Sequence, residues 1–180
     1  MTDAADRIAL LRGLRATRRF LDDPVPDAAL ADILEVARRS GSAMNRQPWR
    51  LIVIRDRATL RRLGAITTHA GHLASAPLAI ALVMDGENEI EEAYDEGRLS
   101  ERIMLAAAAH GLGSCIGWFL DEGHSPAAGA ILGVPDDHTL RTVISIGYRD
   151  PAADLRRTGP GRKTLADIAA SERFDGPAPV

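Results

Sequence analysis

Four arginines near the N-terminus are the residues whose type and spacing most directly suggest chemistry. Arg15, Arg18 and Arg19 stand close together, and Arg12 precedes them by about one helical turn. A guanidinium group can hold two phosphate oxygens at once, so several of them where a helix ends could bind a small dianion. Because the chain has 21 arginines and one lysine, a solvated basic surface explains the same spacing equally well.

The sequence places no side chain in a setting typical of a nucleophile or a metal ligand. Cys115, the one cysteine, lies in an apolar stretch, which favours an inert thiol and excludes an intrachain disulfide. His69 and His72 have a spacing that could share a metal, but no third ligand stands nearby, and we interpret both as solvent-exposed helix residues. We therefore predict no metal and no catalytic side chain, and we expect redox chemistry to come from a bound cofactor.

The segment GLGSCIG at 111–117 differs from a dinucleotide-binding loop. Its third glycine is one residue late, and a helix precedes it where a strand is required. We interpret it as the end of a helix followed by a strand. The backbone of that strand could approach a flat ligand closely, because glycine has no side chain in the way.

The elements that must position these residues alternate between helices and strands. Helices are predicted over 3–14 and 126–132, and another helix is predicted to end at 109. Two more are predicted to begin at capping residues, one at Asp27 and one at Asp56, and the second of these continues to 63. Strands are predicted over 51–54, 77–84, 115–120 and 142–148, and a loop over 38–48. The intervals do not form a regular βαβ repeat. We therefore predict one α+β domain over 1–175, with a central, mostly antiparallel sheet flanked by helices, and a frayed tail at 176–180.

Composition and charge exclude several classes of protein. A hydrophobic content of 46% over 180 residues is enough for one sizeable core. Residues 1–62 carry 13 basic and 8 acidic side chains, whereas residues 63–140 carry 2 basic and 12 acidic ones. Such an acidic middle segment argues against nucleic acid as a partner. No apolar run is long enough for a membrane span and the N-terminus lacks a signal peptide pattern, so we expect a cytoplasmic protein.

Three separated segments resemble one known family, the FMN-dependent nitroreductases. Arg15–Phe20 (RATRRF) is similar to the family's RSxRxF opening, and Gly41–Trp49 (GSAMNRQPW) is similar to its PSxxNxQPW loop. Gly111–Gly117, Gly147–Tyr148 and Arg162–Leu165 resemble its second half. The match follows the order of the family over roughly residues 10–170.

The resemblance implies an activity as well as a fold. It implies a homodimer that binds FMN at the subunit interface and passes a hydride from NADH or NADPH through the flavin. The acceptor would be an electron-poor small molecule such as a nitroaromatic or a quinone, reduced by a ping-pong mechanism. Reductive dehalogenases and a flavin-fragmenting enzyme share the scaffold but depend on a lid, for which the short stretch between 51 and 77 leaves little room. A non-catalytic flavin-binding module stays open.

The phosphate of FMN has implied ligands from two parts of the chain. By resemblance, Arg15 and Arg18 would hold it, and Arg162 or Lys163 would supply a further cation. Ala16 stands at the same site where the family usually has serine. One lost hydrogen bond costs roughly 0.5–1.5 kcal/mol, so the implied binding of FMN survives it.

The flavin ring has implied contacts from both subunits. Ser42, Ala43 and Asn45 would approach it from the partner subunit, with Gln47 close by. The backbone at Ile116–Gly117 would face the ring, where an N–H group can stabilise negative charge that builds up on reduction. The loop also departs from the family at its start, because glycine replaces the usual proline at position 41.

Overall fold

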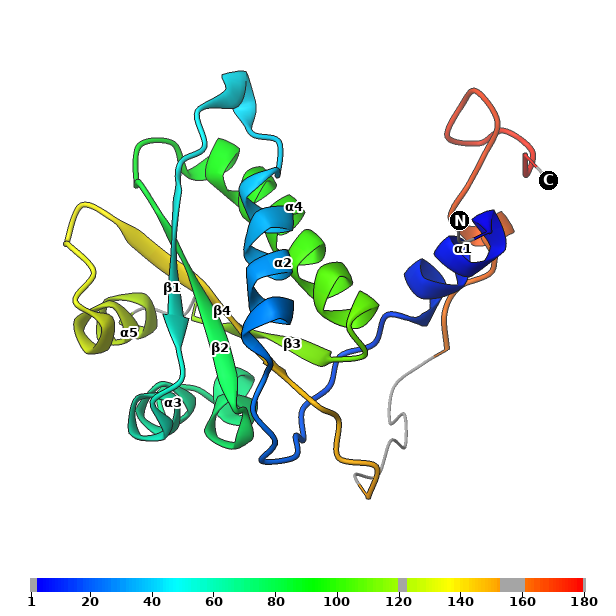
Figure 1. Cartoon of the computed structure of the whole chain (residues 1–180). Coiled ribbons are helices and arrows are strands. Elements are labelled where there is room, and N and C mark those ends of the chain that lie inside the picture. Colours follow the sequence, from blue (N-terminus) through cyan, green and yellow to red (C-terminus); the bar gives the residue numbers. More distant parts are fainter. Residues whose placement is uncertain (1–2, 120–122, 153–160, 180) are drawn as a thin grey trace.

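A four-stranded antiparallel sheet forms the centre of the computed structural model, which describes residues 3–119, 123–152 and 161–179. Its strands are β1 (Trp49–Ile54), β2 (Leu78–Met84), β3 (Gly113–Trp118) and β4 (Thr139–Gly147). They lie in the order β1-β2-β4-β3, so β1 and β3 are the two edges (Figure 1). All three pairings are antiparallel, which confirms the predicted α+β class.

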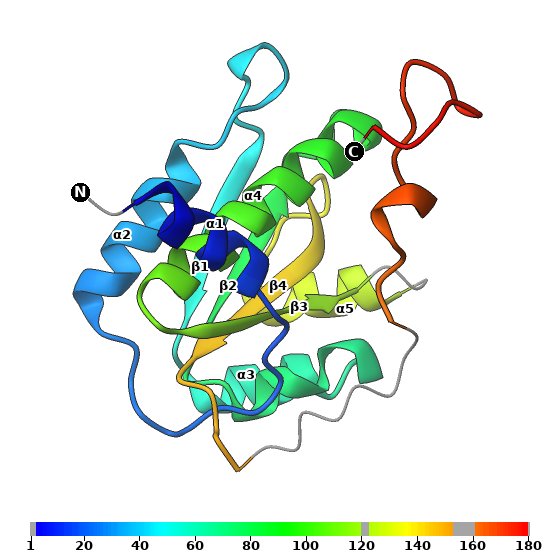
Figure 2. The same ribbon diagram turned by 90° about the vertical axis from the view of Figure 1, so that its right-hand side faces the viewer.

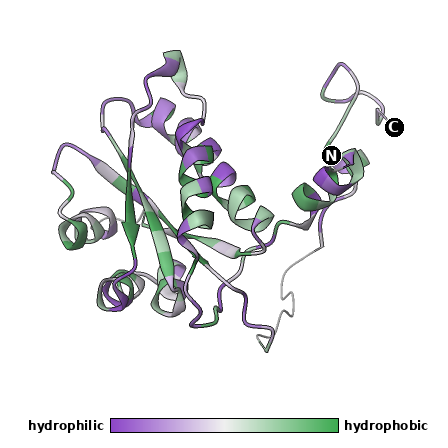
Figure 3. Ribbon diagram, viewed as in Figure 1, coloured by the Kyte–Doolittle hydropathy of each residue, from purple (hydrophilic) through white to green (hydrophobic). Residues whose placement is uncertain are grey.

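The central position of β2 explains its composition. All seven residues of its sequence LAIALVM are buried, because helices cover both faces of the sheet. A continuous apolar run is typical of a strand covered on both faces. Figure 3 shows the same contrast, with hydrophobic residues gathered in the sheet and hydrophilic ones on the outer helix faces.

Two helices cover one face of the sheet. They are α2 (Asp27–Arg38) and α4 (Glu89–Ala109), and both cross the same side in Figures 1 and 2. Ile33 of α2 and Leu99 and Ile103 of α4 are fully buried between these helices and the strands. The helix predicted from Asp27 onward is therefore confirmed.

The opposite face is covered by shorter elements. These are α3 (Arg57–Gly64), the 3-10 helix η2 (Thr68–Ser75) and α5 (His124–Leu132). Leu73 of η2 and Phe119, which follows β3, are fully buried in this second core. Because η2 packs against β3, it lies close to that edge of the sheet.

The two predicted caps had different outcomes. Asp56 caps α3, because its Oδ2 accepts from the Thr59 N–H at 2.8 Å. The prediction that Asp27 caps α2 is wrong, since Asp27 is the first helical residue and the cap position belongs to Pro26. The Asp27 carboxylate instead pairs with Arg55 at 2.6 Å.

Two segments extend away from the sheet on the side of α4. One is α1 (Ala4–Gly13), none of whose residues is buried, and the other is 161–179, with the short helix η3 (Leu165–Asp167) (Figures 1 and 2). Both expose large apolar side chains, including Leu11 at 50% and Phe174, which is fully exposed. No helix among the described residues is both long and apolar enough to cross a bilayer.

Candidate functional site

The free edge of β3 presents backbone groups to the outside. The Phe119 N–H donates to the Arg141 carbonyl at 2.9 Å, and hydrogen-bonded pairs alternate along an antiparallel ladder. Gly117 and Val143 therefore form a bonded pair, whereas Ile116 belongs to a non-bonded one. As a result, the N–H and C=O of Ile116 point away from β4, toward the open edge.

Residues 15–17 cover the first half of this edge. Ala16 forms a parallel bridge with Ser114, and the Thr17 N–H donates to the Ser114 carbonyl at 2.8 Å. A Cβ added to Gly113 would overlap the Thr17 side chain, so the close approach that we expected at this glycine-rich strand is made by the chain itself. The second half of the edge, from Ile116 on, is left open.

The absence of a side chain at Gly117 also allows close packing within the chain. A Cβ at this position would lie 3.3 Å from the Cβ of Ala70 in η2 and 3.1 Å from the Val143 carbonyl oxygen. The space beside this glycine is therefore filled by packing within the chain. A ligand at the edge would meet the outward groups of Ile116 instead.

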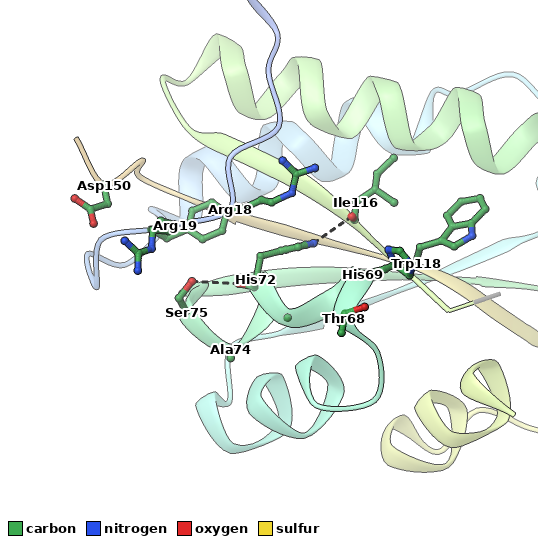
Figure 4. Close-up of a pocket in the computed structure, with 12 residues that line it drawn as sticks. Arg18, Arg19, Thr68, His69, His72, Ala74, Ser75, Ile116, Trp118 and Asp150 are labelled. Carbon is green, nitrogen blue, oxygen red and sulfur yellow. Dashed lines mark hydrogen bonds between the residues drawn. The ribbon is translucent and has the colours of Figure 1, made fainter. Parts of the chain in front are cut away.

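A cleft of about 960 Å³ opens beside Ile116 (Figure 4). Its walls are residues 18–20, the turn of η2, and Ile116 and Trp118 of β3, with Asp150 at one end. Trp118 is 44% exposed, so a ligand in the cleft can reach it. The cleft brings together Arg18 and Ile116, two of the residues predicted for the cofactor.

Another cavity, of about 540 Å³, lies beside residues 14–16. Arg15, Ala16 and Arg162 line it together with Glu101 of α4. Arg15 donates to its neighbours' carbonyl oxygens at 2.7 Å. Lys163 is exposed and lines neither of these cavities.

The four cations predicted to bind the phosphate have no acidic partner among the described residues that would compete with a ligand. Within 3–119, 123–152 and 161–179, no carboxylate forms an ion pair with Arg15, Arg18, Arg162 or Lys163. An anion can therefore bind them without displacing an acidic side chain.

His72 departs from its predicted setting. His69 is exposed as expected, but the prediction of a solvent-exposed His72 is wrong, because its ring is half-buried beneath β3. Nδ1 lies 2.8 Å from Ser145 Oγ, and Nε2 lies 3.1 Å from the Ile116 carbonyl oxygen. Burial lowers the pKa of His72, and the nearby Arg18 charge adds to this. Neither histidine belongs to a metal-binding group among the described residues.

The 41–48 loop has a strained backbone that its own side chains hold. It contains the short helix η1 (Ala43–Asn45), and the φ angles of Met44, Asn45 and Gln47 are 47°, 58° and 54°. Non-glycine residues adopt such angles rarely, because each costs about 1–3 kcal/mol and persists only where the surrounding structure holds it. Ser42 Oγ accepts from the Gln47 N–H at 2.8 Å and closes the loop.

Acidic side chains anchor the same loop from outside. Arg46 pairs with Asp85 at 3.4 Å, with Glu91 at 3.5 Å and, more closely, with Glu87. The turn before α4 and the first turn of α4 therefore hold the loop.

Three carboxylates of α4 are buried behind the loop. Asp95 Oδ2 accepts from the Ala43 N–H at 3.1 Å. Arg141 of β4 donates to Glu96 at 2.9 Å and to Glu92 at 3.2 Å. Sequence analysis missed this acidic row, although the i, i+3, i+4 spacing of its carboxylates places them on one helix face.

The structure divides the predicted site residues between opposite edges of the sheet. Arg15, Ala16, Arg18 and Ile116–Gly117 lie at the β3 edge. The predicted loop residues lie just before β1, at the other edge (Figure 1): Ser42, Ala43, Asn45 and Gln47. Neither of the two cavities described above contains a loop residue, so one chain does not bring all the predicted residues together.

The fold and the site define an α+β protein whose open sheet edge offers cations and backbone groups to an anionic ligand. The chain belongs to the nitroreductase family. The family's sequence model, described as "Nitroreductase family", matches residues 11–96. The NADH dehydrogenase of Thermus thermophilus is 32% identical over 168 residues, covering 74% of this chain and 82% of that protein. The general role of the chain is therefore that of an oxidoreductase.

Other relatives extend the comparison. The chloronitrobenzene nitroreductase of Comamonas testosteroni is 25% identical over 213 residues, covering 88% of this chain and 93% of the relative. The solved FMN-dependent nitroreductase of Clostridium difficile has a TM-score of 0.77 at 28% identity, covering 84% of this chain and 92% of that one. Nitroreductase A of Vibrio parahaemolyticus shares the fold, with a TM-score of 0.81 at 18% identity, covering 97% and 78%.

Proposed function

We propose that the protein is an FMN-dependent oxidoreductase that takes a hydride from NADH or NADPH and passes it to an electron-poor acceptor such as a nitroaromatic or a quinone. The observation that carries this proposal is the β3 edge, where an outward-facing backbone N–H lies beside arginines that have no carboxylate partner among the described residues. FMN combines a dianionic phosphate with a flat ring. The two kinds of group at this edge match those two parts.

The two cavities favour different binding roles for the cations that line them. Arg15 and Arg162 share one cavity, although they are far apart in sequence, and they are the best candidates for the phosphate. Lys163 follows directly and is a further candidate. Arg18 lines the cleft with Ile116, which favours a place closer to the ring than the phosphate role first expected from the sequence. Ala16 can offer the phosphate only its backbone groups.

A homodimer would complete the site. The loop residues Ser42, Ala43, Asn45 and Gln47 lie at the sheet edge opposite Ile116, so they would reach the ring from the partner subunit. A twofold dimer supplies such an exchange twice. The exposed apolar side chains of α1 and 161–179 offer surface for the contact.

The chain would act mainly by binding and orientation. FMN, when bound, supplies the hydride chemistry. The arginines anchor its charge, and the Ile116 N–H donates where negative charge builds up. Because one cleft serves the reductant and then the acceptor, the kinetics should be ping-pong.

Specialised flavoenzymes of the same scaffold receive less support. The segment between β1 and β2 consists of α3 and η2, which both pack on the sheet, and it contains no insertion that could serve as a lid. A flavin-binding module without turnover is the second candidate. A single domain over 1–175, a frayed tail at 176–180 and a cytoplasmic location remain predictions of the sequence.

The direct test uses purified protein. We expect it to take up FMN rather than FAD and to oxidise NADH or NADPH steadily when a quinone or nitroaromatic acceptor is present. Initial rates at several acceptor concentrations should give parallel double-reciprocal lines. Protein that binds no FMN would contradict the proposal, and bound FMN without NAD(P)H oxidation would favour the binding module.

Mixed dimers test the shared site. Arg18→Ala and Asn45→Ala should each damage both sites of a homodimer, but from opposite subunits. Refolding an equal mixture gives half heterodimers, so about a quarter of all sites should regain wild-type FMN affinity. No recovery in a mixture shown to contain heterodimers would place both residues in one chain's site.

A further inference from the structure

His72 is the one polar side chain of η2 that reaches under β3. Its Nε2 contacts the Ile116 carbonyl oxygen (Figure 4). Its Nδ1 contacts Ser145 Oγ on β4, so the ring joins three elements. Ser145 is fully buried and stands opposite Cys115 in the sheet. The proposed function gives this arrangement no role.

The partners of His72 determine where its proton lies. A carbonyl oxygen can only accept, so Nε2 carries the hydrogen that bonds Ile116. Burial disfavours a second proton on the ring, because it lowers the pKa of His72. Nδ1 then accepts from the Ser145 hydroxyl at 2.8 Å, which is shorter than the 3.2 Å from that hydroxyl to the Cys115 carbonyl.

The bond to Ile116 replaces a missing neighbouring strand. Ile116 turns both of its backbone groups to the free edge, where no strand can pair with them. One step earlier on the same edge, the Thr17 N–H satisfies the Ser114 carbonyl. At Ile116 the imidazole does so. Outside the strand ladders, no residue that the structure describes accepts from the Ile116 N–H.

We infer that His72 is a positioning residue for the open edge of β3. Its neutral imidazole hydrogen-bonds the Ile116 carbonyl oxygen, so that of the two outward backbone groups of Ile116 only the N–H is left for a ligand in the cleft. This inference rests on the proposed function, since it concerns how that edge receives the flavin. A carbonyl without its donor would repel the negative charge of the reduced ring. His72 should therefore favour binding of reduced over oxidised FMN.

Two amide variants separate the two hydrogen bonds. The side chain of His72→Gln can place an N–H near the position of Nε2, whereas that of His72→Asn reaches only as far as Nδ1 and Ser145. His72→Leu removes both bonds. We expect His72→Gln to keep the midpoint potential of bound FMN, while the other two variants lose about tenfold in the preference for the reduced form, equivalent to about 30 mV for a two-electron couple. Affinity for oxidised FMN should change little.

The protein without flavin provides a second readout. Nitrogen NMR of the imidazole should show the Nε2–H tautomer, and the Gly117 amide, which shares the Ile116 peptide group, should shift in His72→Asn more than in His72→Gln. The Nδ1–H tautomer, equal potentials for Gln and Asn, or a wild-type potential in His72→Leu would overturn the inference. If the wild type binds no FMN, the proposed function fails, whereas the tautomer and the amide shifts still decide whether His72 positions this peptide.

Discussion

The β3 edge and the 41–48 loop lie at opposite edges of one sheet and are built on opposite principles. At the β3 edge, Arg15 and Arg18 have no acidic partner among the described residues. In the loop, Arg46 contacts three carboxylates, and Asp95 binds the Ala43 backbone. The first region keeps its binding capacity for a ligand, while the second uses its polar groups to hold its own shape.

This difference predicts which property changes when an arginine is removed from each region. An exposed arginine without a partner adds little to folding, so its removal should affect ligand affinity and leave stability unchanged. Arginines paired with buried or clustered carboxylates support a particular conformation. Their removal should lower the free energy of unfolding, and affinity should fall only as far as the loop changes shape.

The largest effect is expected behind the loop, at Arg141. Arg141→Met would leave Glu92 and Glu96 buried without a counter-charge, which should cost about 3–5 kcal/mol in the free energy of unfolding. Urea denaturation would measure this loss. Arg141→Met combined with Glu92→Gln and Glu96→Gln should recover part of it, and a single variant as stable as the wild type would contradict the role of the acidic row.

The next effect is expected at the β3 edge. Arg15→Ala should weaken the binding of FMN by about 1.5–3 kcal/mol, or roughly 10–150-fold in affinity, because a charge-assisted contact to phosphate is lost. Riboflavin, which lacks the phosphate, is the control ligand and should bind as before, and the urea midpoint should not move. Equal losses for both ligands would show that Arg15 acts on the fold or on the ring.

A smaller effect is expected within the loop itself. Arg46→Gln removes three ion pairs of a partly buried side chain and should lower the free energy of unfolding by about 1 kcal/mol. FMN affinity should fall as well, because the strained backbone of the loop loses its anchor. Arg50→Gln is the matched control, since Arg50 is exposed and has no ion pair among the described residues. Identical results for both variants would contradict the anchoring role.

Acid should distinguish His72 from its amide replacement. Burial lowers the pKa of His72 from its ordinary value of 6.5, so below that pH the unfolded state takes up the proton more readily than the folded one. The stability linked to neutral His72 is present above pH 6.5 and is lost as the pH falls through the lowered value. The wild type should therefore lose stability relative to His72→Gln on acidification, as measured by denaturant midpoints. A constant difference would contradict the shift.

The smallest effect is expected at Cys115. Its thiol is buried, and burial raises its pKa, so it stays protonated at neutral pH. Cys115→Ser should keep FMN affinity and NAD(P)H oxidation unchanged. Lost turnover with flavin still bound would assign the thiol a catalytic role.

Local sequence patterns predicted most of the fold. The strand β2, the helix α2 and the Asp56 cap depend on neighbours within a few positions, and all three predictions are confirmed. The failures depend on partners distant in sequence. Asp27 pairs with Arg55, and His72 bonds a strand 44 positions later, which no local spacing reveals.

The same reason limits what the sequence showed of the site. The arginine cluster and the loop were identified from residue types and spacing, and their roles came from the resemblance to the family's motifs. Their division between two sheet edges became visible only from the strand order. The buried row of Glu92, Asp95 and Glu96 was missed because its counter-charge, Arg141, lies 45 positions beyond Glu96.

The half-covered edge of β3 also bears on how the protein behaves without a ligand. Residues 15–17 cover the edge at Ser114, but the outward N–H of Ile116 remains available to any extended peptide that approaches. Unpaired strand edges are sites where chains join and aggregate. A molecule bound there would cover the unpaired part of the edge. The solubility of the protein during storage or overexpression should therefore depend on the fraction of molecules whose cleft is occupied.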